Sequence, residues 1–142
     1  MYGAQPVTLD DILQLLGLTD KNEKPRGKTF FQELTGFAAR ENMTDSQLYN
    51  AVGMHRTRFY VLRDKKDASV KKKLCLKLCI VLRLSVYETI YLMALAKHSF
   101  SPGVDRTDEI VNHCLQSGIY SPEKIDELLY DNGLETLFSE YE

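Results

Sequence analysis

The sequence predicts an all-α protein. Apolar residues recur at spacings of three and four through most of the chain, and no segment of strand length alternates apolar with polar residues. Short stretches rich in capping and turn residues separate the helical segments. With 142 residues, of which 44% are hydrophobic and 27% charged, the chain has the composition of one globular domain with short extensions.

Residues 1–28 are expected to hold a short amphipathic helix and a polar linker. The segment TLDDILQLLG begins at Thr8, a residue type that caps helices, and ends at Gly17. One apolar side of this helix is the predicted partner or dimer face: Leu9, Ile12, Leu13 and Leu16. An isolated helix of about ten residues is marginally stable in water. We therefore expect it to dock on its own domain, on a second copy of the chain or on a protein partner.

Residues 29–98 are expected to form a bundle of five helices. Capping boxes predict two of the starts, at Thr44 with Gln47 and at Ser85 with Glu88. Gly53 is expected to end the second helix, because glycine adopts a left-handed conformation at the lowest cost. The segments run from about Phe30 to Asn42, Thr44 to Gly53, His55 to Arg63, Val70 to Leu84 and Ser85 to His98.

Residues 99–142 are expected to add two further helices after the turn sequence SFSPG. The first runs from Asp105 to Gly118, and the second begins at Ser121 and Pro122 and stops before Gly133. Their apolar spacing predicts that each buries one face. We expect three carboxylates of the last helix to form a solvated face: Asp126, Glu127 and Asp131.

Charge is segregated along the chain although the net value is only −2. Residues 55–83 carry ten basic and two acidic residues, a segment charge of +8, whereas residues 84–142 carry three basic and eleven acidic residues, a segment charge of −8. A concentrated basic segment is what a polyanionic partner requires. The alternative is that Lys71, Lys72 and Lys73 only form a solvated helix start.

Residues 45–65 have the pattern of two helices joined by a tight turn, the second of them exposed on one side. Inward-facing residues are expected at Leu48, Ala51, Val52, Met54, Phe59 and Leu62. The exposed side then offers side chains suited to base edges, predicted at His55, Arg56, Thr57 and Tyr60. Phosphate contacts are predicted at Gln47, Arg58, Arg63, Lys65, Lys66, Lys71 and Lys72. Val61 is a further candidate for the exposed side.

This pattern resembles a known family. The segment LYNAVGMHRTRFYVLRDK, continued by VKKKLCLKLCIVLRLSVYETIYLM, is similar to the Cro/repressor-type (XRE-like) helix-turn-helix domain over residues 30 to about 97. The resemblance implies a five-helix repressor-like bundle that binds double-stranded DNA and regulates transcription. The tail resembles a branch of these domains with two additional C-terminal helices.

Two residues depart from the family pattern. Tyr49 stands where the family usually has alanine at the close approach of the two motif helices, so the tyrosine must lean outward or widen the angle between them. Asp45 stands where a phosphate-binding glutamine is usual. Since a carboxylate repels phosphate, either Gln47 and the helix terminus substitute or the duplex sits differently.

Other chemistries have weaker support. Cys75 and Cys79 with His113 and Cys114 could form a zinc site, but cysteines four apart within one helix fit small core residues better. No nucleophile with a base and an orienting group emerges, so we predict neither an enzyme nor a cofactor. Three cysteines fit a reducing compartment, and the sequence lacks a membrane-length apolar run, so a cytoplasmic protein is expected.

The sequence therefore favours a cytoplasmic, sequence-specific DNA-binding regulator, expected to be a homodimer because one short helix reads few base pairs. The alternative is a protein-interaction module that keeps the bundle but does not bind DNA. Tyr49, Asp45 and the acidic C-terminal segment favour this alternative.

Overall fold

The computed structural model describes residues 29–65 and 69–139, and all regular elements in these ranges are α-helices. They are α2 (Phe30–Arg40), α3 (Asp45–Ala51), α4 (Arg56–Asp64), α5 (Lys72–Val81), α6 (Val86–Leu95), α7 (Arg106–Gln116) and α8 (Pro122–Asp131). The all-α prediction is confirmed. The predicted helix and linker of residues 1–28 lie outside the described residues.

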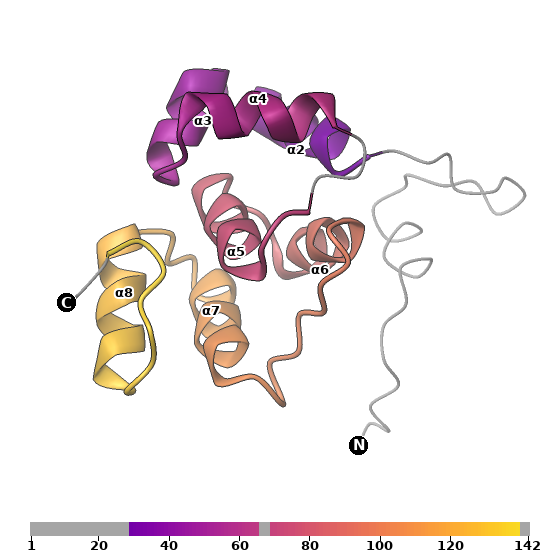
Figure 1. Cartoon of the computed structure of the whole chain (residues 1–142). Coiled ribbons are helices and arrows are strands. Elements are labelled where there is room, and N and C mark those ends of the chain that lie inside the picture. Colours follow the sequence, from indigo (N-terminus) through magenta and orange to yellow (C-terminus); the bar gives the residue numbers. More distant parts are fainter. Residues whose placement is uncertain (1–28, 66–68, 140–142) are drawn as a thin grey trace, which may run out of the picture.

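The helices stack in the order of the chain. In Figure 1, α2, α3 and α4 lie together on one side, α5 and α6 occupy the middle, and α7 and α8 lie on the opposite side. Helix α5 contacts both α3 and α6, α2 packs on α6, and α7 packs on α6 and α8. The two C-terminal helices are thus attached to the side of the bundle away from α4. Within the described ranges, no helix combines the length and apolarity needed to cross a bilayer.

Side-chain caps fix where most of the helices begin. The predicted capping boxes of Thr44 with Gln47 and Ser85 with Glu88 are both present. In each, the hydroxyl accepts the N–H three residues ahead, and the longer side chain accepts the N–H of the cap residue. A third box, Thr29 with Gln32, opens α2 and was not predicted.

Left-handed residues follow most of the helices, although not α4. The three glycines expected to end helices have positive φ: Gly53, Gly118 and Gly133, at 69°, 71° and 73°. Arg83 adopts the same conformation, with φ of 54°, directly after the last turn of α5. The prediction that this helix reaches Leu84 was therefore wrong, because a left-handed residue cannot continue a right-handed helix.

The core is continuous from α2 to the residues beyond α8. Five of the six predicted inward-facing residues of the motif are buried: Leu48, Val52, Met54, Phe59 and Leu62. Ala51 is exposed, so its prediction was wrong. The buried side of α3 runs through Leu48, Val52 and Tyr49, and a step of about 100° per residue turns Ala51 away from it.

The residues after α8 fold back onto the bundle. The Asp126 carboxylate is buried and accepts hydrogen bonds from three consecutive backbone N–H groups, those of Leu137, Phe138 and Ser139, at 2.8 to 3.2 Å. Asp126 was expected on a solvated face, which is wrong for this residue alone, since Glu127 and Asp131 are exposed. A buried carboxylate needs hydrogen-bond donors, and the returning chain supplies them.

Candidate nucleic-acid interface

Helix α4 is held rigidly against its neighbours through one buried aromatic residue. Phe59 is 1% exposed, and its ring lies 5.2 Å from that of Phe31, 5.4 Å from Tyr49 and 5.5 Å from Tyr60, measured between centroids. These are tilted or edge-to-face pairs, the arrangement aromatic rings prefer. Leu62, in the last turn of α4, is buried as well. The opposite side of α4 consequently faces solvent.

The N-terminus of α4 carries a cap that the family resemblance did not supply. His55 precedes the helix, and its Nδ1 accepts the N–H of Thr57 at 3.2 Å. An imidazole nitrogen that accepts a hydrogen bond is unprotonated, so the proton of the neutral ring sits on Nε2. The cap therefore leaves the Nε2–H group as a free donor, and the His55 side chain that carries it is exposed.

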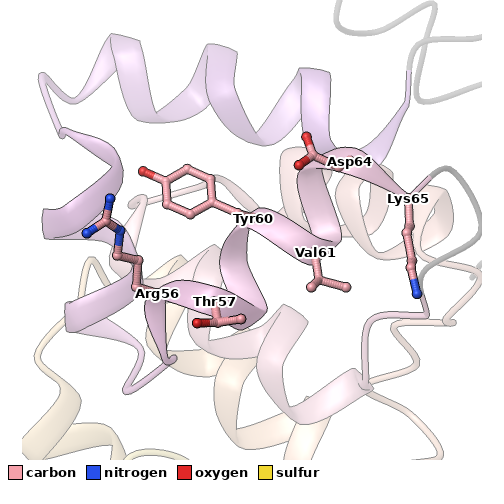
Figure 2. A pocket seen from close by; sticks show the side chains of 6 residues that line it. All are labelled: Arg56, Thr57, Tyr60, Val61, Asp64 and Lys65. Carbon is pink, nitrogen blue, oxygen red and sulfur yellow. The ribbon is translucent and has the colours of Figure 1, made fainter.

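Three of the four predicted base-contacting residues line one open hollow on α4. Figure 2 shows this hollow, formed by Arg56, Thr57, Tyr60, Val61, Asp64 and Lys65. Arg56 and Thr57 are exposed, and Tyr60 is half-buried. The fourth residue, His55, is exposed at the start of the same helix. The four residues thus lie between the N-cap and the middle of α4, with the Thr57 side chain turned to the other side of the helix from Arg56 and Tyr60.

The ring of Tyr60 contacts two guanidinium groups. The Cζ atom of Arg63 is 4.5 Å from the centroid of the Tyr60 ring, and that of Arg56 is 5.7 Å away. Cation–π contacts of this kind hold long arginine side chains in a preferred direction. Of the two, Arg63 also binds the carboxylate of Asp64, with Nε 2.8 Å from Oδ1. This hydrogen bond raises the pKa of Arg63 and lowers the pKa of Asp64.

Arg63 is therefore less suited to phosphate than the sequence indicated. Its charge is balanced locally by Asp64, and the carboxylate of Asp45 adds a weaker attraction that also raises the pKa of Arg63. In contrast, Arg56 has no carboxylate within ion-pair distance among the described residues. Arg56 is thus an exposed cation whose described contact is the ring of Tyr60.

The other predicted phosphate contacts fall into two groups. Arg58, Lys65 and Lys71 are exposed and make no ion pair with a described carboxylate. The Arg58 guanidinium donates to the backbone oxygen of Ser69 at 3.3 Å, which ties α4 to the segment before α5. Gln47 is exposed, but its Oε1 is used in the cap of α3. Lys66 lies outside the described residues.

Lys72 belongs to a different set, because the C-terminal helices already hold its charge. Its Nζ lies 2.7 Å from Oδ2 of the buried Asp108 and 3.4 Å from Oδ2 of Asp105. Burial lowers the pKa of Lys72, but the two carboxylates outweigh it and the pKa is raised overall. The neighbouring Lys73 pairs with Glu135 at 3.1 Å. These lysines are less available to phosphate than Lys71, and they are not the simple solvated helix start of the alternative interpretation.

The two departures from the family pattern have structural answers. The ring of Tyr49 is half-buried and packs on Phe59, so it lies between α3 and α4 rather than leaning outward. Asp45 is exposed in the first turn of α3. It adds negative charge on the α4 side of the bundle, where it interacts with Arg63.

The cysteines are core residues in this structure. Cys75, Cys79 and Cys114 are free, and all three are fully buried. Burial is the largest cause that raises the pKa of the Cys79 thiol, and burial also raises the pKa of the Cys114 thiol. His113 is exposed. No group of three or more metal-binding side chains occurs in residues 29–65 and 69–139.

Sequence reasoning found most of the exposed side of α4 but missed two features of it. It did not anticipate that Asp64 would balance Arg63, although the two residues are adjacent in the sequence. Val61 was predicted only as a further candidate for the exposed side, whereas in the structure this residue lines the hollow. The predicted partner face at Leu9, Ile12, Leu13 and Leu16 lies outside the described residues. Comparisons of the chain with protein families, with curated proteins and with solved structures find no match.

Proposed function

We propose that this protein is a sequence-specific, double-stranded DNA-binding regulator on a repressor-like five-helix bundle, with α4 as its recognition helix in the major groove. The observation that carries the proposal is the exposed Arg56, which has no described carboxylate partner and sits on a helix anchored by the buried Phe59. The major groove is wide enough to admit an α-helix, and cationic side chains on such a helix can contact the edges of the bases.

The side chains divide by role. In this proposal Arg56 donates two hydrogen bonds to the O6 and N7 edge of guanine, and His55 offers a single N–H from its Nε2. Arg58 on α4, Lys65 at the C-terminal end of α4 and Lys71 at the start of α5 are exposed and are suited to phosphates. Lys72 is left out of this set because Asp108 and Asp105 hold it.

The charge distribution supports one binding side. Residues 99–139, which include α7 and α8, carry eight acidic and two basic residues, and these two helices lie on the far side from α4 in Figure 1, so they would repel a duplex from that side. A nine-residue helix reads only a few base pairs, which is why we include a homodimer in the proposal. A two-fold pair would place two α4 helices about one duplex turn apart.

Fluorescence anisotropy of labelled duplex DNA tests the proposal. Wild type is expected to bind at about 50 mM salt and to lose affinity steeply as salt rises, because phosphate contacts release counterions. The variant Arg56→Ala with Arg58→Ala should lose at least about tenfold in affinity. A matched control, Arg106→Ala with Lys124→Ala, removes the same charge from the C-terminal helices and should lose much less.

The alternative is a protein-interaction module, and specific observations favour it. Asp45 adds negative charge near α4, Asp64 balances Arg63, and Lys72 and Lys73 pair with carboxylates of the C-terminal segment. The positive field around α4 is smaller than the segment charge of +8 indicates. Absence of duplex binding at about 50 mM salt, or equal loss in both double variants, would favour this alternative.

A further inference from the structure

The side chain of Val61 does not pack on the hydrophobic core formed by residues 29–65 and 69–139. It is half-buried on α4, yet it is not among the apolar side chains that pack on the described core, unlike its neighbour Tyr60. Valine is also a weaker helix former than alanine or the long polar residues. An aliphatic, β-branched side chain on the solvent side of a short basic helix therefore calls for another explanation.

Val61 pairs with Thr57 across one helical turn. The two residues are four apart, which places them about 6 Å apart along the helix axis on the same side of α4. Both line the open hollow, and in Figure 2 their side chains point to the same side of the helix, away from Arg56 and Tyr60. Their methyl groups add apolar surface to the hollow, which Arg56, Tyr60 and Lys65 also line.

The geometry points to Thr57 and Val61 as a site that reads the C5-methyl group of thymine, beside a guanine that Arg56 contacts. The inference rests on the proposed DNA binding and adds what the helix reads there. In the major groove the C5-methyl is the one apolar group that a base edge presents, and side-chain methyls are its usual partners. A polar base edge placed there instead would lose water without gaining a hydrogen bond.

The hydroxyl of Thr57 does not contradict this role. The backbone N–H of Thr57 is already bonded to His55, so this residue is fixed at the first turn of α4. Its side chain carries one methyl and one hydroxyl, and the hydroxyl can donate to a phosphate or to an acceptor on a neighbouring base. Val61 carries two methyls and no polar group, so it supplies most of the apolar contact. Val61 is thus the residue whose removal tests the site.

Thymine-to-uracil exchange in the duplex isolates this contact, because it removes the methyl group and leaves base pairing intact. Duplexes that bind the full-length wild-type protein are first selected from a random pool, and each thymine of the selected site is then replaced by uracil. At one or two positions next to a guanine, wild type should lose about fourfold in affinity, the effect of exposing one methyl group. The variants Val61→Ala and Thr57→Ser should show less than about twofold discrimination at the same positions.

Lys65→Ala is the matched control, since Lys65 lines the same hollow but carries no methyl group. It should weaken binding to both duplexes and keep the fourfold preference for thymine. Val61→Ala is expected to fold, because alanine favours helix and the residue lies outside the core cluster. The inference is overturned if no uracil position costs wild type more than about twofold, or if Val61→Ala keeps the preference. If no duplex binds the wild type at all, the proposed function fails together with the inference.

Discussion

The ammonium group of Lys72, at the start of α5, lies 2.7 Å from the carboxylate of Asp108 in the first turn of α7. The same carboxylate oxygen accepts the N–H of Ser101 at 2.9 Å, and the aspartate is fully buried. This contact joins the bundle to the C-terminal helices across a separation of 36 residues in the chain. Lys72 belongs to the basic segment of the sequence, but its charge stabilises the contact between the bundle and the C-terminal helices.

Replacement of Lys72 by methionine should lower the free energy of unfolding and should have little effect on the affinity for DNA. The change keeps most of the apolar stem but leaves the Asp108 carboxylate buried without its cation, which should lower the free energy of unfolding by about 2 kcal/mol. Urea denaturation measures this loss. Lys71→Met is the control, because Lys71 is exposed and unpaired among described carboxylates, and it should change stability by less than about 0.5 kcal/mol. Equal stability of the two variants would contradict the structural role.

Local patterns in the sequence predicted the positions of the helices well. A capping box such as Ser85 with Glu88, or a glycine such as Gly53, acts through residues a few positions apart, so its effect can be deduced without the fold. The same holds for the buried spacing of Phe59 and Leu62 on α4. Arg83 was missed as a helix stop because nothing in its residue type marks a left-handed conformation.

Contacts between distant segments could not be predicted in this way. Asp126 looks like any exposed carboxylate of an amphipathic helix until the chain returns and places three N–H groups on it. Likewise, Lys72 looks like a free phosphate contact and Lys73 like a solvated lysine until Asp108 and Glu135 are brought beside them. For the candidate site, the sequence indicates which residues α4 exposes, whereas the tertiary structure decides which charges remain unbalanced.

Asp126→Asn should loosen the C-terminal segment. The carboxylate accepts hydrogen bonds from the N–H groups of Leu137, Phe138 and Ser139, and an amide can accept with only one of its two polar atoms. We expect a loss of about 2 kcal/mol in unfolding free energy, since each hydrogen bond to a charged group contributes about 1.5 kcal/mol or more. Hydrogen exchange at the Leu137 and Ser139 amides should become faster than in Glu127→Gln, a control change on the exposed side of the same helix. Unchanged protection of both amides would contradict the role of Asp126.

Glu88 should make the fold sensitive to acid. Burial raises the pKa of Glu88, but the hydrogen bonds from Arg40 and from the N–H of Ser85 outweigh it, so the folded pKa lies below the ordinary value. Stability from this group is therefore fully present above the unfolded pKa of about 4.3 and is lost as pH falls through the folded pKa. Glu88→Gln should cost about 1 to 2 kcal/mol at pH 7 and much less near pH 3. A constant difference between Glu88→Gln and wild type over this pH range would rule out the ion pair as its cause.

His55 has two separable roles, and two substitutions distinguish them. Its Nδ1 caps α4 by accepting the N–H of Thr57 at 3.2 Å, while its Nε2 carries the proton proposed to contact DNA. Asparagine is a good N-cap residue, so His55→Asn should keep the unfolding free energy within about 0.5 kcal/mol of wild type, whereas His55→Ala should lose about 1 kcal/mol. Both variants lack the ring N–H, so both should bind duplex DNA about three- to tenfold more weakly, the effect of one hydrogen bond. If His55→Asn binds DNA with wild-type affinity, His55 acts only as the cap of α4. If His55→Ala also binds with wild-type affinity, an ordered first turn of α4 is not needed for binding.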